Sequence, residues 1–311
     1  MASRYARSIV LESPITRDVQ RRSRFYWTPY LLIMPVLLSL GFLFYNIGLT
    51  VYESLRDHKF FNPTLAAFNN LGNYKRLFTD PMIALSLQNS LFWVAGTVFI
   101  AFILGFILAL LLNQDFFGRG IYRALVLSPW AISGVVAVMM WAWILNGNYG
   151  VLNDLLVRLG LPGWQRAWLA DPKTAMLSVI ISSVWRGVPF FAVTILAALQ
   201  AIPMELYEAA VVDGAGTLAK FWYVTLPMIK GVLVITTLLR TVWAFNWIEN
   251  IYAMTGGGPG YATTTWAYYL FRQFFDYGDI GYACAMGVIL MIGLLIFSVI
   301  YLKLTAVTEG Y

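Results

Sequence analysis

Long apolar runs separated by short polar segments dominate the pattern along the chain. A transmembrane helix needs about 20 consecutive, predominantly apolar residues, and six stretches of the sequence reach that length. The pattern therefore predicts an all-α, polytopic membrane protein with six transmembrane helices. The predicted spans are roughly Tyr30–Tyr52, Ser86–Leu112, Ala124–Leu145, Thr174–Gln200, Gly231–Ala253 and Gly281–Leu304.

The polar segments predict the domain organisation and the orientation. We expect a cytoplasmic N-terminal segment at 1–28, a six-span transmembrane domain at 29–305 and a short cytoplasmic tail at 306–311. Lys and Arg close to a first span favour the cytoplasmic side, and six spans then place both termini and the 203–230 stretch in the cytoplasm. The first run is too long for the core of a signal peptide. The cations that precede it are Arg4, Arg7, Arg17, Arg21, Arg22 and Arg24.

Composition and charge narrow the functional classes. The chain is 60% hydrophobic and 12% charged, whereas soluble domains carry about 25% charged residues. The net charge is +6, and the Lys and Arg residues lie mainly in the loops. We therefore expect these cations to set the orientation of the spans in the membrane, and we expect no nucleic-acid partner. Cys284 is the only cysteine and His58 the only histidine, which excludes an intrachain disulfide and argues against a metal site.

One charged, amphipathic stretch, 203–230, interrupts the apolar runs. Pro203 suits the first turn of a short helix, and Gly214 and Gly216 permit a sharp bend after it. A second short helix is expected to stop before Pro227, because the residue that precedes a proline disfavours the α region. A helix–turn–helix outside the membrane, tied at both ends to spans, indicates a docking element that transmits force.

The same stretch carries a recognisable motif. Its elements are Glu208-Ala209-Ala210, Asp213-Gly214-Ala215, Phe221 and Leu226-Pro227. With this spacing, the stretch resembles the cytoplasmic EAA loop of permease subunits of binding-protein-dependent ABC importers. The chain departs from many members at Gly231, where they have a proline.

A second set of residues, Thr255-Gly256-Gly257-Gly258-Pro259 followed by Thr263-Thr264-Thr265, resembles the outer loop of the carbohydrate-uptake class. The triple glycine resembles the first of two paired permeases, of the maltose, lactose, trehalose and glycerol-3-phosphate type. The resemblance spans roughly residues 28 to 304. It implies a bacterial inner-membrane subunit that takes a sugar from an extracytoplasmic binding protein into the cytoplasm by alternating access. It also implies a second permease, two ABC ATPase subunits and contact with membrane lipid.

The resemblance assigns roles to two groups of residues. Glu208 would dock in a cleft of the ATPase, small Ala209 and Ala210 would allow its close approach, and Asp213 and Gly214 would form the bend; the alternative is a solvated helix face. The loop from Gly256 through Gly257 and Gly258 to Pro259 would be a flexible scoop that faces the binding protein; the alternative is a plain connector. No P-loop pattern and no catalytic constellation is visible in the sequence. We therefore expect a non-catalytic subunit that binds no cofactor itself, with ATP–Mg on the partner ATPases.

A substrate path is expected along spans four to six. Intramembrane cations such as Arg186 and Arg240 are costly and usually face a cavity or the bundle interior. They either line the path or pair structurally, for instance with Glu249 or the second permease. Ordinary packing and an interfacial aromatic belt are the alternative for the aromatic residues. If span five is one helix, Trp243, Asn246, Trp247 and Asn250 share a face, and the family alignment adds Gly187, Phe190, Arg240, Ala244 and Trp247 near the cavity.

Three other functions compete with this interpretation. A secondary active transporter predicts repeats with broken helices and acidic residues at the midplane, and neither is evident. An ABC permease for a non-sugar solute is disfavoured by the 255–265 loop. A membrane-embedded enzyme lacks a catalytic constellation. Within the sugar class, the two arginines suit an anionic sugar as readily as a neutral one.

Overall fold

The computed structural model describes residues 27–62 and 67–305. The described residues are helical apart from loops and two isolated β-bridges, which confirms the all-α prediction for this part of the chain. The chain divides into two units, and the boundary in the sequence falls between Leu49 and Thr50. The six N-terminal arginines and the 306–311 tail, on which the predicted orientation partly rests, lie outside the described residues.

The first unit contains most of α1 (Thr28–Ser54), an apolar helix long enough to cross a membrane. The second unit is built on four long helices: α3 (Pro81–Leu112), α7 (Ala175–Gln200), α10 (Leu226–Asn246) and α13 (Ile280–Thr305). Five helices in the described part of the chain meet the length and hydropathy expected of a span, and a bent pair would make a sixth. The chain is therefore an integral membrane protein with five to six candidate spans.

The core of the second unit lies where α3 crosses α7. Small residues on α3, Gly96 and Gly105, let the two backbones approach. A Cβ at Gly105 would come within 3.0 Å of the backbone nitrogen of Ala192, and one at Gly96 would lie 2.9 Å from Ile180 Cδ1. The indole of Trp93, which is almost fully buried, fills the same interface.

The third span is broken, so its prediction as one helix is wrong. It consists of α4 (Arg119–Ala131) and α5 (Gly134–Ile144), which meet at 93°. Ile132 and Ser133 between them have ψ angles of 134° and 140°, outside the helical region. Two consecutive extended residues turn the chain, and α5 then packs against α11 (Glu249–Met254).

The fifth span also differs from its prediction as one helix. It ends as α10 at Asn246, and α11 follows after Trp247 and Ile248. The indole N–H of Trp93 donates to the carbonyl of Ala244 at 3.0 Å, and the backbone N–H of Trp247 donates to the same carbonyl at 3.3 Å. This three-residue bond tightens the last turn and closes the helix.

The 203–230 stretch begins with two short helices, α8 (Met204–Val212) and α9 (Thr217–Lys220), as the sequence predicted. The prediction that the second short helix stops before Pro227 is wrong. The π turn η3 (Phe221–Thr225) joins α9 to α10, and the helical path is continuous from Thr217 to Asn246. We infer that the wider turn gives room for the proline ring, which would otherwise clash with the preceding turn.

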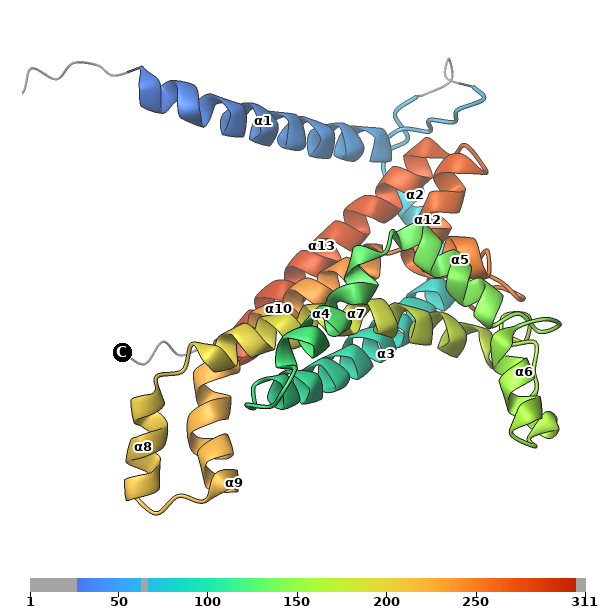
Figure 1. The fold of residues 1–311 in the computed structure, drawn as a ribbon. Coiled ribbons are helices and arrows are strands. Elements are labelled where there is room, and N and C mark those ends of the chain that lie inside the picture. The colour runs from blue at the N-terminus through green and yellow to red at the C-terminus, as the bar shows by residue number, and fades with distance from the viewer. Residues whose placement is uncertain (1–26, 63–66, 306–311) are drawn as a thin grey trace, which may run out of the picture. The chain divides into compact units, whose positions relative to one another are not determined.

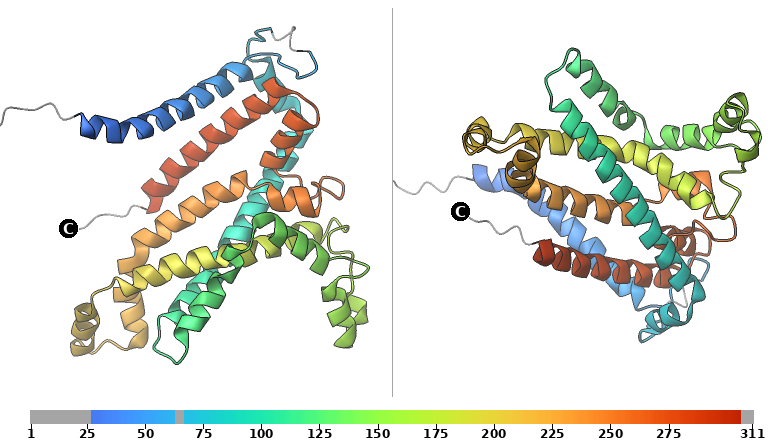
Figure 2. Two further views of the ribbon diagram at one scale, coloured as in Figure 1. Left: turned by 45° about the horizontal axis from the view of Figure 1, so that its top comes forward. Right: turned by 90° about the horizontal axis from the view of Figure 1, so that it is seen from below.

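The segments between the long helices contain short helices that hydropathy does not reveal. They are α2 (Gly72–Thr79), α6 (Val151–Arg158), the 3₁₀ turn η2 (Pro162–Trp164) and α12 (Trp266–Phe275). Within the second unit, the α8–α9 hairpin lies at one end of the long helices, and α2 and α12 lie at the other (Figures 1 and 2). The two ends are thus separated by the length of the spans.

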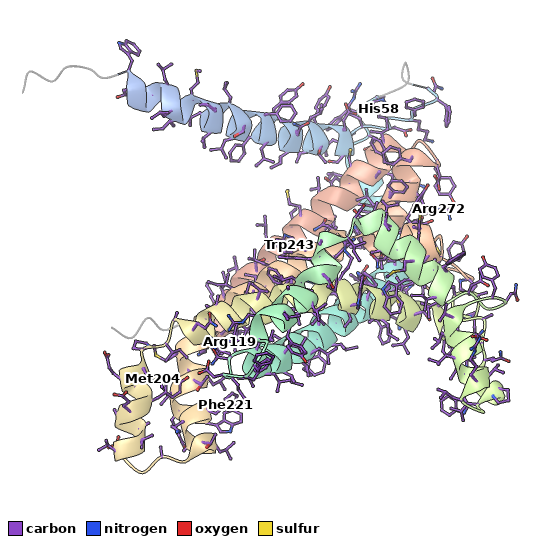
Figure 3. All side chains as sticks on the ribbon, in the orientation of Figure 1. His58, Arg119, Met204, Phe221, Trp243 and Arg272 are labelled. Carbon is purple, nitrogen blue, oxygen red and sulfur yellow. The ribbon has the colours of Figure 1, made fainter. Side chains whose placement is uncertain are left out.

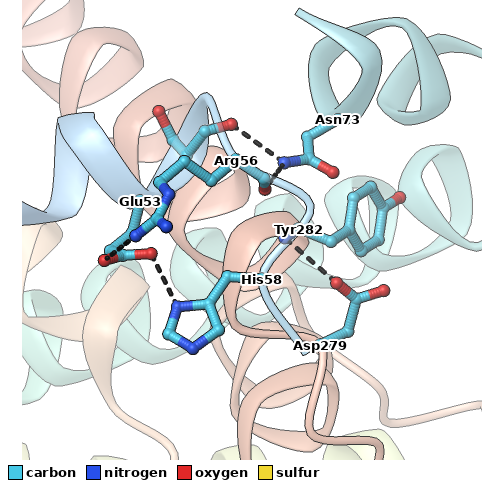
Figure 4. Close-up of polar contacts among 7 residues, drawn as sticks. Glu53, Arg56, His58, Asn73, Asp279 and Tyr282 are labelled. Atoms are coloured by element: carbon cyan, nitrogen blue, oxygen red, sulfur yellow. Dashed lines mark hydrogen bonds and ion pairs between the residues drawn. The ribbon is translucent and has the colours of Figure 1, made fainter. Parts of the chain in front are cut away.

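Hydrogen bonds order the end that carries α2. The Nδ2 atom of Asn73 donates to the carbonyls of Ser54 and Arg56, at 2.9 and 2.8 Å (Figure 4). His58 Nδ1 lies 2.7 Å from Glu53 Oε2 in the same picture. These contacts tie the loop after α1 to α2.

Candidate functional site

The α8–α9 hairpin is defined by its turn. Gly214 has a φ of +79°, the left-handed conformation that favours glycine. The N–H of Ala215 donates to the carbonyl of Ala210 at 2.8 Å, and that of Gly214 donates to Val211 at 3.0 Å. Together these bonds form a Schellman motif that ends α8. Gly216 has an ordinary φ of −69°, so Gly214 alone provides the bend predicted from the two glycines.

The hairpin presents an unburied surface. None of the residues of α8 is buried, and Glu208, Ala209 and Asp213 are exposed. Large apolar side chains lie open beside them, including Val212 and Leu218, which are 87% and 71% exposed. Met204 and Phe221 mark this end of the molecule, and Arg272 and His58 the opposite one (Figure 3). A surface of small and apolar residues around the glutamates of α8 suits a protein partner.

The hairpin is anchored to the span helices at its base. Tyr207 on α8 shares a hydrogen bond of 3.0 Å with the Thr225 hydroxyl at the start of α10. The ring of Phe221 packs edge-on against Phe106 of α3, with the ring centroids 6.2 Å apart. These contacts join α8 to η3, which leads into α10, and η3 to α3.

The glycine-rich loop lies at the opposite end of the second unit. Gly256, Gly257 and Gly260 all have positive φ, and a Cβ at Gly257 would overlap the ring of Tyr268. The threonines that follow are almost fully buried. Thr263 Oγ1 donates to Gly258 O at 2.8 Å, and Thr264 Oγ1 donates to Gly257 O at 2.9 Å. The sequence suggested a flexible scoop, whereas these bonds give the loop a defined shape.

A cluster of charged groups sits where α7, the α10–α11 break and the start of α5 meet. Trp247 contacts two arginines: the guanidinium carbon of Arg240 is 4.7 Å from its ring centroid, and that of Arg186 is 5.2 Å. Arg186 Nη1 is 3.7 Å from Glu249 Oε2. Cation–π contacts of this kind are favourable, more so away from water.

Two glycines make room for these side chains. A Cβ at Gly187 would lie 2.7 Å from Arg240 Nη2, and one at Gly134 would lie 2.7 Å from Arg186 Nη1. Both distances are too short for an alanine at an unchanged arginine position. The glycines therefore leave space for the two guanidiniums at these positions.

Aromatic rings extend the cluster along the spans. Phe190 on α7 packs against Trp243 of α10, with centroids 5.3 Å apart, and against Trp130 of α4 at 6.1 Å. About half of the surface of Trp130 and of Trp243 is exposed. Exposed aromatic faces beside polar groups are typical of small-molecule sites.

The structure brings together most, not all, of the residues predicted for a substrate path. Arg186, Gly187, Arg240 and Trp247 form the charged cluster, and Phe190 and Trp243 the aromatic one. Ala244 is buried in the core. Asn246 donates to the carbonyl of Val242 in its own helix, and Asn250 is buried and donates to Ser182. The break after α10 removes the shared face predicted for the two asparagines.

The sequence did not single out Trp130 and Gly134 for this site. Both lie on the broken third span, and a straight helix in place of α4 and α5 gives no reason to set them beside α7. The signal was the Ala131-Ile132-Ser133-Gly134 stretch, where small and β-branched residues interrupt the apolar run.

Known proteins resemble the chain over most of its length. Residues 101–306 match the family model of the binding-protein-dependent transport system inner membrane component. The trehalose/maltose transport system permease protein MalF of Thermococcus litoralis is 36% identical over 275 residues, which are 88% of this chain and 92% of that protein. The sulfoquinovosyl glycerol transport system permease protein SmoG of Agrobacterium fabrum is also 36% identical, over 88% of this chain and 89% of that protein.

A solved structure resembles the fold as well. It is the bacterial alginate ABC transporter in complex with a periplasmic protein that holds an alginate pentasaccharide. One of its chains aligns with a TM-score of 0.77 at 21% identity, covering 90% of this chain and 94% of that one. From the family match over more than half of its length and the relatives at more than 30% identity, the chain belongs to the family of inner membrane components of binding-protein-dependent transport systems.

Proposed function

We propose that this chain is the permease subunit of an ATP-driven importer that carries a sugar or sugar derivative across the bacterial inner membrane. The observation that carries the proposal is the exposed α8–α9 hairpin, which presents Glu208 and bare apolar side chains at one end of the spans. Its relatives include permeases named for trehalose and maltose and for sulfoquinovosyl glycerol. Those names leave open whether the sugar is neutral or anionic.

The hairpin is the proposed contact for the ATPase, on the cytoplasmic side. Glu208 accepts charge-assisted hydrogen bonds from the partner, and Ala209 and Ala210 allow a close fit. Asp213 and Gly214 hold the turn that aims α8. ATP and Mg²⁺ bind to the partner ATPase subunits, and this chain supplies no catalytic group. Closure of the ATPases moves α8, and the contacts of Tyr207 and Phe221 pass the motion to α10 and α3.

The loop from Gly256 to Pro259 is the proposed contact for an extracytoplasmic sugar-binding protein. It lies at the end of the second unit away from the hairpin (Figure 2), and its threonine bonds hold it in shape. The substrate then passes the cluster of Arg186, Trp247 and Arg240 and the aromatic rings beside it. A second permease completes the path opposite these helices, and the spans alternate between inward- and outward-facing states.

Co-purification tests this assembly. The chain is tagged, extracted from native membranes with a mild detergent, and the proteins that remain bound are identified by mass spectrometry. We expect one further permease and an ABC ATPase at a ratio of two ATPases to two permeases. A chain that elutes alone or as a homodimer would contradict the proposal and favour a secondary transporter.

A further inference from the structure

We infer that the cluster around Trp247 recognises an anionic group, so that the transported sugar carries a carboxylate, sulfonate or phosphate. The inference rests on the proposed function for the path itself, and adds the charge of the substrate. Two arginines face one glutamate at this cluster, and the helices α3, α4, α5, α7, α10 and α13 contain no aspartate or glutamate. The described cluster therefore has one positive charge in excess.

Arg240 is the less compensated of the two cations. Its residue surface is only 4% exposed, and within residues 27–62 and 67–305 no hydrogen bond or ion pair reaches its guanidinium. Its Nε atom is buried without a partner. A buried charge is costly unless it is paired, and one cation–π contact with Trp247 offsets only part of that cost. The unpaired guanidinium of Arg240 therefore favours the binding of an anion.

Arg186 is only weakly neutralised. Its distance of 3.7 Å from Glu249 is an ion pair without a hydrogen bond, and the Glu249 side chain is 54% exposed to solvent. Both Nε and Nη1 of Arg186 are buried without a hydrogen-bond partner in the described structure. A guanidinium presents a planar fork of donors that matches a carboxylate, sulfonate or phosphate. Two such forks beside one indole define where the acid group binds.

The groups beside the arginines suit the rest of the molecule. Trp243 and Trp130 offer half-exposed aromatic faces against which a sugar ring packs, and Phe190 links them. The residues that would bind the acid group and the rings that would pack against the sugar are therefore neighbours on α4, α7 and α10. Gly187 leaves space for the Arg240 side chain, because a Cβ at residue 187 would lie 2.7 Å from Arg240 Nη2.

The test measures binding to the assembled complex in lipid nanodiscs, without the binding protein, so that only the membrane site discriminates. The probes are glucuronate, glucose 6-phosphate and glucose, and dissociation constants come from saturation-transfer NMR. We expect each acidic probe to bind at least tenfold more tightly than glucose, and the preference to weaken with salt. Equal affinities, or no binding of either acidic probe, would overturn the inference.

Variants locate the preference. Arg240→Gln and Arg186→Gln should each reduce the preference for acid over glucose to within about threefold, while Arg240→Lys should retain part of it. Lys303→Gln removes an exposed cation at the far end of α13 and serves as the matched control, with the preference unchanged. A preference that survives both glutamine variants would overturn the assignment to this cluster.

Two further outcomes separate the inference from its alternatives. If a carboxylate of the second permease neutralises Arg240, then Arg240→Gln weakens co-purification of that permease and leaves any acid preference intact, which overturns the inference. If the complex imports a neutral sugar with ATP hydrolysis and ignores the acidic probes, the charge assignment fails while the proposed importer function stands.

Discussion

Asp80 shows how single residues hold together the end of the second unit that carries α12. Its Oδ2 atom accepts hydrogen bonds from the hydroxyls of Tyr269 on α12 and Tyr282 on α13, at 2.8 and 2.7 Å, and its Oδ1 accepts from the N–H of Met82 at 2.9 Å. Burial raises the pKa of Asp80, but these bonds and the nearby Arg76 outweigh it and hold the pKa below its ordinary value. One carboxylate thereby joins three helices.

A pH dependence of stability follows from Asp80. Because its pKa is lower in the folded protein, the stabilisation is complete above the ordinary carboxyl pKa of about 3.9 and is lost as the pH falls through the folded value. Thermal unfolding in nanodiscs between pH 7 and pH 3 measures this. Asp80→Asn should lower the melting temperature at pH 7 and flatten its fall below about pH 4. Parallel curves for the wild type and Asp80→Asn would contradict the role given to the carboxylate.

A substitution at Gly257 tests whether the shape of the glycine-rich loop depends on this residue. Gly257→Ala adds a Cβ that overlaps Tyr268 at a φ of +78°, and a left-handed alanine costs about 1–2 kcal/mol before any clash. Hydrogen exchange at the amides of 255–265 should accelerate at least tenfold. Gly163→Ala, whose Cβ would meet open space, is the control. Equal exchange in wild type and Gly257→Ala would mean that the loop does not depend on this glycine.

At the scale of elements, the α8–α9 hairpin depends on one turn. A Cβ added at Gly214 or at Gly216 would meet open space, but only Gly214 has a positive φ. Gly214→Ala should therefore destabilise the hairpin by about 1 kcal/mol and weaken ATPase binding about fivefold, while Gly216→Ala should not. Pull-down titration with the partner ATPase measures the binding affinity of both variants. Equal losses in the two variants would show that flexibility, and not the left-handed turn, matters there.

Glu208 is the charged group of the same element. Glu208→Lys reverses its charge on an exposed helix face, so the fold should persist while ATP hydrolysis uncouples from uptake. Glu205→Lys alters another exposed glutamate of α8 and is the matched control. The ratio of sugar taken up to ATP hydrolysed is the readout. A wild-type ratio in Glu208→Lys would remove the residue from the coupling contact.

Hydropathy predicted the long helices well because a helix in a membrane must satisfy its backbone hydrogen bonds internally and must be apolar over the thickness of the membrane. It could not predict the breaks. The end of α10 depends on the indole of Trp93, which is 151 residues away from Ala244. The corner at Ile132 and Ser133 interrupts the apolar run too briefly for hydropathy to divide the span. For the same reason, Arg186 and Arg240 were visible in the sequence as costly cations, whereas their shared contact with Trp247 was not.

On the scale of the whole molecule, the second unit separates two surfaces by the length of its spans. The hairpin lies at one end and the glycine loop at the other (Figure 1). The arginine cluster lies on α7 and at the end of α10, between these two surfaces in the chain's long helices. A subunit that receives a solute at one face and force at the other needs this separation. An alternating-access permease uses both ends without doing chemistry of its own.

The most direct test of the central claim is sugar uptake by the complex in proteoliposomes. The vesicles contain ATP and Mg²⁺, ATP alone, or neither, and the binding protein with labelled sugar is added outside. We predict uptake only with ATP and Mg²⁺ inside, at a rate unchanged when ion gradients are collapsed. Uptake that proceeds without ATP and stops when a proton or sodium gradient is collapsed would contradict the account.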